Sequence, residues 1–140
     1  MAKKKQDEWN CLSVRQPRAW AIVVGAKDVE NRDRRSNYLG RLYIHASQTE
    51  DVNAVEETTE RVAAHLGISA SAARARYRRH LKQGLGAIIG HVQMFGCAVS
   101  YESEWFDRQS RYGYLLRDPV RLRQPRPAKG STTIPFKFRP

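Results

Sequence analysis

The stretch Gly40–Ala46 alternates between apolar and polar side chains, and this pattern most constrains what the chain can fold into. A period of two residues is that of a β-strand with one buried face. The apolar face carries Leu42, Ile44 and Ala46, and the opposite face carries Arg41, Tyr43 and His45. A longer apolar run at Gly86–Ser100, interrupted by Gly90 and Gly96, predicts a second strand with bulges or bends. These two segments require a sheet.

Shorter strand-like runs lie at residues 10–15, 28–32, 112–117 and 134–138, so we expect five to six strands. The Asp118-Pro119 pair is expected to end one of them, with 120–122 as a short continuation and 124–130 as a basic polyproline-type connector. An early helix is predicted between Pro17, which suits a first helical position, and Gly25, which suits the left-handed position after a helix. The fold class is therefore α+β.

Residues 47–85 predict a helical hairpin inserted into this sheet. Ser47 and Glu50 form a capping-box pattern for a helix that stops at Gly67, and Ser69 begins a second helix. The first helix carries five acidic residues and one arginine, whereas the second carries five basic residues and no acidic ones. We expect residues 1–140 to form one domain, with residues 1–9 as a mobile polar tail.

The chain is strongly basic, with 25 lysines and arginines against 14 acidic residues and a net charge of +11. Such an excess favours a polyanionic partner. We expect nucleic acid rather than a membrane, because no run approaches the ~18 apolar residues of a membrane span. Without a signal peptide, and with Cys11 and Cys97 outside any disulfide framework, we expect a cytoplasmic protein. Neither the cysteines nor the four histidines have metal-ligand spacing, so no metal or other cofactor is expected.

The segment Gly25–Arg32 places a lysine, a carboxylate and an arginine within six residues. Lys27 can contact phosphate as a point charge or, if it is desolvated, lose its proton and act as a base. Arg32 offers a planar fork to phosphate or to a guanine edge. Glu30 and Arg32 are two residues apart and share a strand face, so a structural ion pair explains them equally well.

A dense positive surface and several aromatic residues are further candidates for contacting nucleic acid. The basic row on the second predicted helix can follow phosphates, or it can simply be a solvated face paired with the acidic helix. Aromatic rings can stack on bases, although most aromatic residues belong to the core. Trp105, in a polar loop with Ser103, is the ring most expected to touch a ligand. His45 is either an acid–base group or a structural histidine.

Several motifs in order resemble the ASCH family, whose name stands for activating signal cointegrator homology. The matching segments are Leu12-Ser-Val-Arg-Gln-Pro17, Gly25-x-Lys27-x-x-Glu30-x-Arg32, Arg41-Leu-Tyr-Ile-His-Ala-Ser47, Gly86-Ala-Ile-Ile-Gly90, Tyr112-Gly-Tyr-Leu-Leu-Arg-Asp-Pro119 and Pro127-x-Lys129-Gly130. The resemblance covers about residues 12–47 and 86–130 and leaves out the helical hairpin. Arg18 departs from it, because the family often has tryptophan there; Trp20 is expected to supply that aromatic wall or the wall is missing.

The resemblance implies a small PUA-like β-barrel with a cleft beside the lysine motif and a nucleic-acid partner, RNA rather than DNA. The resemblance extends to a few members described as enzymes, which are either ribonucleases for single-stranded RNA or amidohydrolases acting on an acylated cytidine. In the amidohydrolase branch the position of Lys27 is the catalytic lysine. That branch has threonine at the position of Glu30, so the ribonuclease is the better enzymatic alternative.

Three hypotheses follow: a nucleic-acid-binding module, an enzyme that uses the same cleft, or a protein-interaction domain that uses the hairpin. The candidate catalytic residues are Lys27 and Glu30. The candidate nucleic-acid-binding residues are Lys27, Arg32, Arg15, Arg18, Trp20, Tyr43, Ser103, Trp105, Arg74, Arg78 and Lys82. A closed pocket around Lys27 would indicate a base or nucleoside, whereas an open groove would indicate strand binding.

Overall fold

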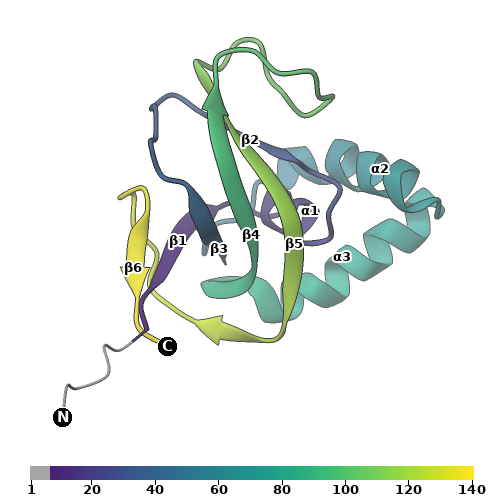
Figure 1. The fold of residues 1–140 in the computed structure, drawn as a ribbon. Helices are drawn as coiled ribbons and strands as arrows, with labels where there is room; N and C mark the ends of the chain where they lie inside the picture. Colours follow the sequence, from purple (N-terminus) through teal and green to yellow (C-terminus); the bar gives the residue numbers. More distant parts are fainter. Residues whose placement is uncertain (1–6) are drawn as a thin grey trace.

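A strongly curled six-stranded sheet forms the body of the protein in the computed structural model, which describes residues 7–140 (Figure 1). Its strand order is β2-β5-β4-β3-β1-β6. The strands are β1 (Trp9–Val14), β2 (Val29–Arg32), β3 (Gly40–Ala46), β4 (Ala87–Ala98), β5 (Tyr112–Pro127) and β6 (Phe136–Phe138). The α+β class and the six strands confirm the prediction, and the sheet is curled into an open half-barrel. Of the predicted tail, residues 1–6 lie outside the described residues, and Trp9 already belongs to β1.

The two long strands β4 and β5 pair antiparallel along most of their length, whereas β1 and β3 are parallel. The register shifts between Ile88 and Gly90 and again between Met94 and Gly96, which confirms the predicted bulges. At Gly90 a Cβ atom would lie 2.5 Å from the carbonyl oxygen of Val120, so only glycine allows the strands to approach this closely.

Strand β5 runs through Asp118-Pro119 to Pro127, so the predicted stop and the predicted polyproline connector were wrong. Asp118 adopts a positive φ of 54° there, and the strand continues beyond it. Its neighbour β2 pairs only with residues Tyr112 to Leu115. The Leu116 N–H still donates to the Asp28 carbonyl at 2.9 Å. Beyond it, no strand of residues 7–140 pairs with this side of β5, and a proline there removes no ladder hydrogen bond.

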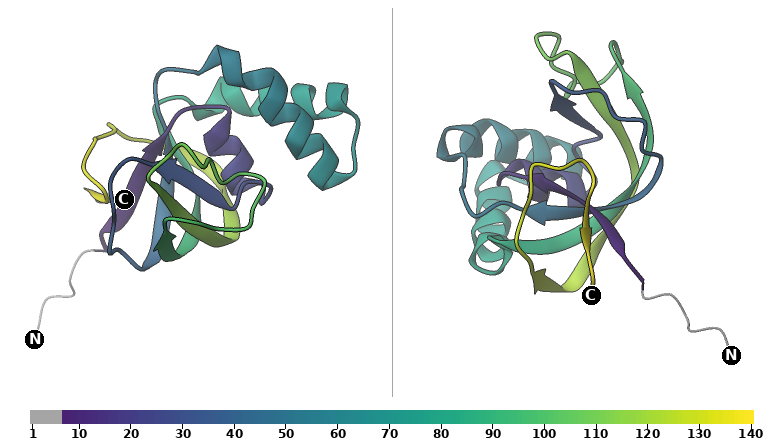
Figure 2. Two further views of the ribbon diagram at one scale, coloured as in Figure 1. Left: turned by 90° about the horizontal axis from the view of Figure 1, so that it is seen from above. Right: turned by 90° about the vertical axis from the view of Figure 1, so that its left-hand side faces the viewer.

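The helices are α1 (Arg18–Val23), α2 (Val55–Leu66) and α3 (Ala70–Gly84), with a short 3-10 turn η1 (Val52–Ala54) before α2. The hairpin of α2 and α3 lies to one side of the sheet, and α1 lies between the sheet and the hairpin (Figure 2). The predicted cap at Ser69 is confirmed, because its hydroxyl accepts a 3.1 Å hydrogen bond from the Ala72 N–H. Among the helices of residues 7–140, none has the length and apolar character that crossing a membrane requires.

The predicted capping box at Ser47 was wrong, because α2 begins at Val55 instead. The Ser47 N–H donates to the Val14 carbonyl at 3.0 Å, and the Asp51 N–H donates to the Gln16 carbonyl at 2.8 Å. These long-range bonds hold residues 47–51 against the end of β1 and the start of α1. Val52, which lies within the helix predicted from Ser47, belongs instead to the turn η1 and is 66% exposed.

The hairpin leaves and rejoins the sheet at adjacent points. Ala46 is the last residue of β3 and Ala87 the first of β4, and the two are paired in the ladder. The Gly86 N–H also donates to the Ala46 carbonyl at 2.8 Å. The excursion therefore begins and ends side by side.

Helix α1 separates two clusters of buried side chains. Ile22 and Val23 pack into the sheet core with residues such as Leu12 and Ile44. Trp20 and Ala21 pack into a second cluster with side chains of α2 and α3, among them Val62 and Tyr77. This short helix therefore joins the sheet to the hairpin.

Both faces of β3 are buried, so the prediction of a half-exposed strand was wrong. Tyr43 is 8% exposed and stacks on Trp9 with 4.0 Å between ring centroids. His45 is 2% exposed, and its ring is bonded to the Ala128 carbonyl through Nε2 and to the Ser13 hydroxyl through Nδ1. The second face is thus covered by residues from the first and last parts of the described chain. The alternation within β3 alone does not reveal this cover.

Candidate functional site

The lysine motif forms the turn between α1 and β2. Gly25 ends α1 with a φ of 87°, and the N–H groups of Ala26 and Lys27 both donate to the Ala21 carbonyl, at 3.1 and 2.9 Å. The chain then enters β2, where Glu30 is paired with Tyr114 of β5. This tight turn directs the Lys27 side chain inward.

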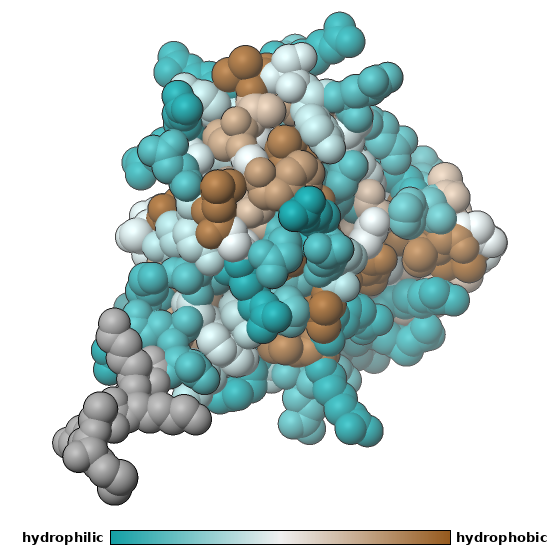
Figure 3. All heavy atoms as spheres, in the orientation of Figure 1, coloured by the Kyte–Doolittle hydropathy of each residue, from teal (hydrophilic) through white to brown (hydrophobic). Residues whose placement is uncertain are grey.

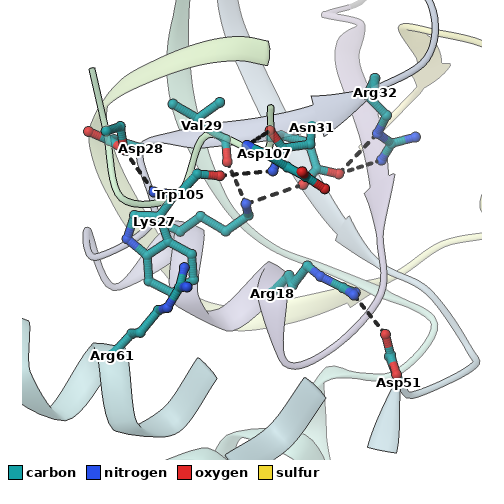
Figure 4. A network of polar contacts seen from close by, with 12 residues as sticks. Arg18, Lys27, Asp28, Val29, Asn31, Arg32, Asp51, Arg61, Trp105 and Asp107 are labelled. Carbon is teal, nitrogen blue, oxygen red and sulfur yellow. Dashed lines mark hydrogen bonds and ion pairs between the residues drawn. The ribbon is translucent and has the colours of Figure 1, made fainter. Parts of the chain in front are cut away.

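Lys27 is 3% exposed, and its ammonium contacts three groups (Figure 4). Nζ donates to the Val29 carbonyl at 2.5 Å and lies 3.8 Å from Oε1 of Glu30. It also lies 5.3 Å from the centroid of the Trp105 ring, within the range of a cation–π contact. The lysine is therefore enclosed rather than free to reach along a surface.

Glu30 bridges the two cations of the motif. Its Oε2 accepts a 3.0 Å hydrogen bond from Nε of Arg32 and lies 2.9 Å from Nη2 of the same guanidinium. Arg32 also donates from Nη2 to the Ser13 carbonyl at 2.6 Å, which links β2 to β1. The structural ion pair is therefore present, and it leaves Glu30 oriented toward Lys27.

Burial lowers the pKa of Lys27 from its ordinary value, because an ammonium loses its hydration there. Glu30 opposes this shift as the nearest negative charge, and Asp28 opposes it more weakly. Arg18 and Arg61 add to it by charge repulsion. The amine can thus lose its proton more readily than an exposed lysine, which is what a general base requires.

The loop between β4 and β5 is fastened over Lys27 by the motif itself. Asn31 donates from Nδ2 to the Trp105 carbonyl at 2.8 Å and accepts from the Asp107 N–H at 2.9 Å. The Ser103 hydroxyl donates to Asp28 at 2.5 Å. Trp105 is consequently held at 8% exposure, with the Arg61 guanidinium 5.0 Å from its ring centroid.

Two adjoining hollows surround the motif. A pocket of about 380 Å³ is lined by Lys27, Trp105 and Arg61, among others. A larger cleft of about 690 Å³ is lined by Glu30 and by four arginines, Arg15, Arg18, Arg32 and Arg34. Both are bordered by Arg18, Asn31 and Asp107, so they adjoin. Lys27 lines the smaller of the two.

The structure brings some of the predicted residues to this site and separates others from it. Lys27, Glu30, Arg32, Arg15, Arg18 and Trp105 border the hollows. Ser103 supports the loop through Asp28. Arg18 is bonded to Asp51 at 2.7 Å.

Trp20 and Tyr43 lie away from the cleft. Trp20 is 1% exposed and packs against Tyr77, with 5.4 Å between ring centroids. Tyr43 is stacked on Trp9 in a separate cluster. Neither ring offers a face to a base in this cleft, and the aromatic wall beside Lys27 is Trp105 instead. Arg74, Arg78 and Lys82 lie on α3 and border neither hollow.

Two residues of the site were missed by sequence reasoning. Asn31 lies inside the motif, but its role depends on the loop at 103–107, which is more than 70 residues away in the chain. Arg61 is the single arginine of an otherwise acidic helix, and that isolation was the available signal. No group of three or more histidine, cysteine, aspartate or glutamate side chains within residues 7–140 could hold a metal ion.

Comparison with known proteins gives a similarity of structure only, because neither a protein-family model nor a curated protein matches the sequence. A crystal structure of ASCH from Zymomonas mobilis is similar, with a TM-score of 0.45 and 19% identity over 84% of this chain and 71% of that one. A point mutant of the same Zymomonas mobilis protein matches with a TM-score of 0.45 and 20% identity, over 88% of this chain and 76% of that one. Both carry the family name that the sequence motifs resemble.

Proposed function

We propose that this chain is an ASCH-type domain that binds nucleic acid, RNA in preference to DNA, in the cleft beside Lys27. The observation that carries the proposal is the buried lysine beneath Trp105, in a pocket that adjoins an arginine-lined cleft. The preference for RNA rests on the sequence resemblance. The net charge of +11 supports a polyanionic partner.

The two hollows suit different parts of a nucleotide. The pocket of about 380 Å³ falls in the range of ~300–1,000 Å³ that small-molecule sites occupy. It offers an aromatic ring for stacking and an ammonium for a hydrogen bond to a base edge. The larger cleft is lined by four arginines, of which Arg18 and Arg32 are paired with Asp51 and Glu30. Arg15 and Arg34 make no ion pair within residues 7–140, and a guanidinium group can bind phosphate in bidentate fashion. We therefore assign the base to the pocket and the adjoining phosphates to the cleft.

The binding test compares two charge-removing variants. Arg15 is exposed and borders the cleft, whereas Arg41 is exposed on β3 and borders neither hollow. With a labelled single-stranded RNA, Arg15→Ala is expected to lower affinity several-fold and to reduce the salt slope by about 0.7, the value per phosphate contact on a single strand. Arg41→Ala is expected to leave both nearly unchanged.

The same titration decides whether the proposal stands. Affinity that does not change between ~50 and ~200 mM salt would argue for a protein partner of the hairpin instead. An absence of binding to any RNA or DNA at the lower salt would overturn the nucleic-acid proposal. Tighter binding of the DNA strand of the same sequence would overturn the preference for RNA.

A second candidate function is cleavage of RNA in the same pocket, in which the 2′-oxygen bonds to the phosphorus and the 5′-oxygen leaves with a proton, giving a cyclic phosphate. The specific observation in its favour is the desolvated Lys27, whose lowered pKa suits a base, with Glu30 at 3.8 Å. Cleavage needs a base for the 2′-hydroxyl proton, an acid for the leaving oxygen and cations that stabilise the phosphorane. Lys27, Glu30 and Arg32 are assigned to these tasks. Glu30 at the threonine position makes the amidohydrolase alternative weaker.

The catalytic test separates binding from chemistry. Lys27→Ala that abolishes cleavage while RNA affinity stays within a few-fold would exclude the module that only binds. Lys27→Arg keeps a positive charge but cannot act as a base near neutral pH, so it should bind and not cleave. If the unmodified protein cleaves neither RNA nor an acylated cytidine, the enzymatic candidate is excluded.

A further inference from the structure

A second pocket lies between α1, α3 and the outer half of β5. Its volume is about 700 Å³, and it shares no lining residue with the cleft beside Lys27. One group of lining residues is apolar: Trp20, Val23, Val24, Leu66 and Pro119. The other group is polar: Arg76, Arg79, His80, Gln83 and Arg121. The pocket therefore combines an apolar wall with three guanidinium groups.

The three arginines have no anionic partner within residues 7–140. Arg76, Arg79 and Arg121 make no ion pair and no side-chain hydrogen bond there, and no carboxylate lines the pocket. The acidic helix α2 does not neutralise them either, because its one ion pair is internal, between Arg61 and Glu57. Three like charges around one hollow repel one another, and an anion would remove that repulsion.

His80 adds a buried polar group that lacks a partner. It is 8% exposed, and its Nε2 makes no hydrogen bond to any described residue. Burial, together with the positive charge of Arg121, lowers its pKa to about 4, so the imidazole is neutral at pH 7. Buried polar atoms are normally paired. Nε2 of Gln16 is also buried without a partner, and both atoms lie beside Gly84, so His80 adds an unsatisfied polar group at the base of the pocket rather than an atom open to it.

The surroundings of the pocket are also hydrophilic. On the face shown in Figure 3, hydrophilic side chains dominate the lower edge, and apolar side chains gather over the upper part of the sheet and on the right, at the helical hairpin. Arg76, Arg79 and Arg121 are exposed, whereas Trp20 and Val23 are buried, so a ligand that enters the pocket meets positive charge first. This order suits a charged group attached to a flat apolar one.

We propose that this pocket is a second binding site and that it takes a nucleoside phosphate, with the phosphate on the guanidinium groups of Arg76, Arg79 and Arg121 and the base against the apolar wall. The nucleoside phosphate is either a free nucleotide or one unit of a nucleic-acid strand. The second source rests on the function proposed above, because the same strand then occupies the cleft beside Lys27.

Strand β5 sets the separation of the two sites. Its residue Tyr114 is paired with Glu30 of the cleft, and Arg121 lies seven positions further along. At a rise of ~3.3 Å per residue this is at most about 23 Å along the strand. A stacked strand advances ~3.4 Å per nucleotide, so about seven nucleotides are enough to reach both sites.

The test uses the double variant Arg79→Gln/Arg121→Gln, with Arg41→Gln as the control for charge. Amide chemical shifts are followed while a free nucleoside monophosphate, and separately inorganic phosphate, is added. Shifts are expected at residues 76–83 and 119–121 with the nucleotide, and they should be lost in the double variant but kept in the control. Weaker binding of inorganic phosphate alone is also expected, since it lacks the base.

A strand of about twelve nucleotides and one of about three then distinguish the sources. If one strand occupies both sites, the double variant should lower affinity for the longer RNA about tenfold and leave the shorter one unchanged. If the double variant and the control Arg41→Gln bind the longer RNA equally well, the site takes free nucleotides and not a unit of the strand. A nucleotide that shifts only cleft residues, or inorganic phosphate that binds as tightly as the nucleotide, would overturn the proposal.

Failure of the proposed function gives a different result. RNA that shifts no residue around Lys27, while a nucleotide still shifts residues 76–83, would leave this second site intact. Folding is monitored by thermal unfolding, and relief of charge repulsion should keep the double variant at least as stable as the unmodified protein. If the double variant is destabilised, Arg79→Lys, which keeps the charge, serves as the rescue variant.

Discussion

Asn31 holds Trp105 in place from the neighbouring strand, with its Nδ2 only 2.8 Å from the Trp105 carbonyl oxygen. Its Oδ1 accepts from the Asp107 N–H at the same time, so a single amide fastens both sides of the turn. The wall of the Lys27 pocket is therefore positioned by a residue of the motif that carries the lysine.

Replacing Asn31 with alanine should release this loop. Both hydrogen bonds are lost, and each contributes about 1 kcal/mol, so the free energy of unfolding should fall by about 2 kcal/mol. Hydrogen exchange at the Asp107 amide should accelerate, and RNA affinity should fall. Asn53→Ala is the matched control, because Asn53 is exposed in η1. Unchanged exchange at residue 107 would contradict the assigned role.

The Lys27–Glu30 pair should be strongly non-additive in a double-mutant cycle. Glu30→Gln leaves a buried ammonium without its carboxylate and is expected to destabilise the fold by about 3 kcal/mol. Lys27→Met removes the buried charge and leaves Glu30 paired with Arg32, so it should be milder. In the Lys27→Met background Glu30→Gln should be much less destabilising, as measured by urea unfolding. Additive effects would show that the two groups do not interact.

His80 should make the protein less stable in mild acid. The unfolded chain takes up a proton near pH 6.5, whereas burial lowers the pKa of folded His80 to about 4. Between these values the unfolded state binds more protons, so the free energy of unfolding should fall by about 3 kcal/mol as the pH falls from 6.5 to 4. The nearby charges are Arg76 and Arg79 on α3 and Arg121 on β5.

The matched variant for this prediction is His80→Gln, which retains a polar side chain without a titrating group in this range. Between pH 6.5 and 4 the free energy of unfolding of this variant should fall by about 3 kcal/mol less than that of the unmodified protein. His45 and His91, whose pKa values burial also lowers, are present in both proteins and cancel in the comparison. Parallel pH profiles would show that the pKa of His80 does not change on folding, which would contradict the prediction.

Gly90→Ala tests the close approach of β4 to β5. The added Cβ would lie 2.5 Å from the Val120 carbonyl oxygen and 2.7 Å from Cγ1 of Val23, and the backbone atom cannot rotate away. We expect a loss of about 2–3 kcal/mol in urea unfolding. At Gly96 the Cβ would meet only a Leu115 methyl at 3.3 Å, so Gly96→Ala should change stability by less than about 1 kcal/mol. Equal effects would contradict the contact at Gly90.

Features set by neighbouring residues could be predicted from the sequence. The alternation in β3 gave its bounds, and the Ser69 cap and the Gly67 stop depend on atoms within a few residues. Ser47 had an equally good local pattern, but a hydrogen bond to the distant Val14 carbonyl decides its conformation. The continuation of β5 past Pro119 depends on where β2 stops pairing, which no pattern within β5 contains.

The same distinction applies to the site. Lys27, Glu30 and Arg32 lie within one turn and one strand, so their clustering followed from spacing. Trp105 was a candidate because a large ring in a polar loop is unusual. The contacts of Asn31 and Arg61 with that loop join segments far apart in the chain, and only the three-dimensional structure brings them together.

The two ends of the helical hairpin join the sheet at neighbouring positions, so the pairing of the sheet does not depend on the hairpin's sequence. Because Ala46 and Ala87 already face each other in the ladder, the sheet's hydrogen bonding is complete whatever chain lies between them. That excursion nevertheless supplies Arg61 to the pocket of Lys27 and Arg76 and Arg79 to the second pocket. Exchanging this one segment would therefore replace lining residues of both pockets at once, while the strand pairing of the half-barrel stays the same.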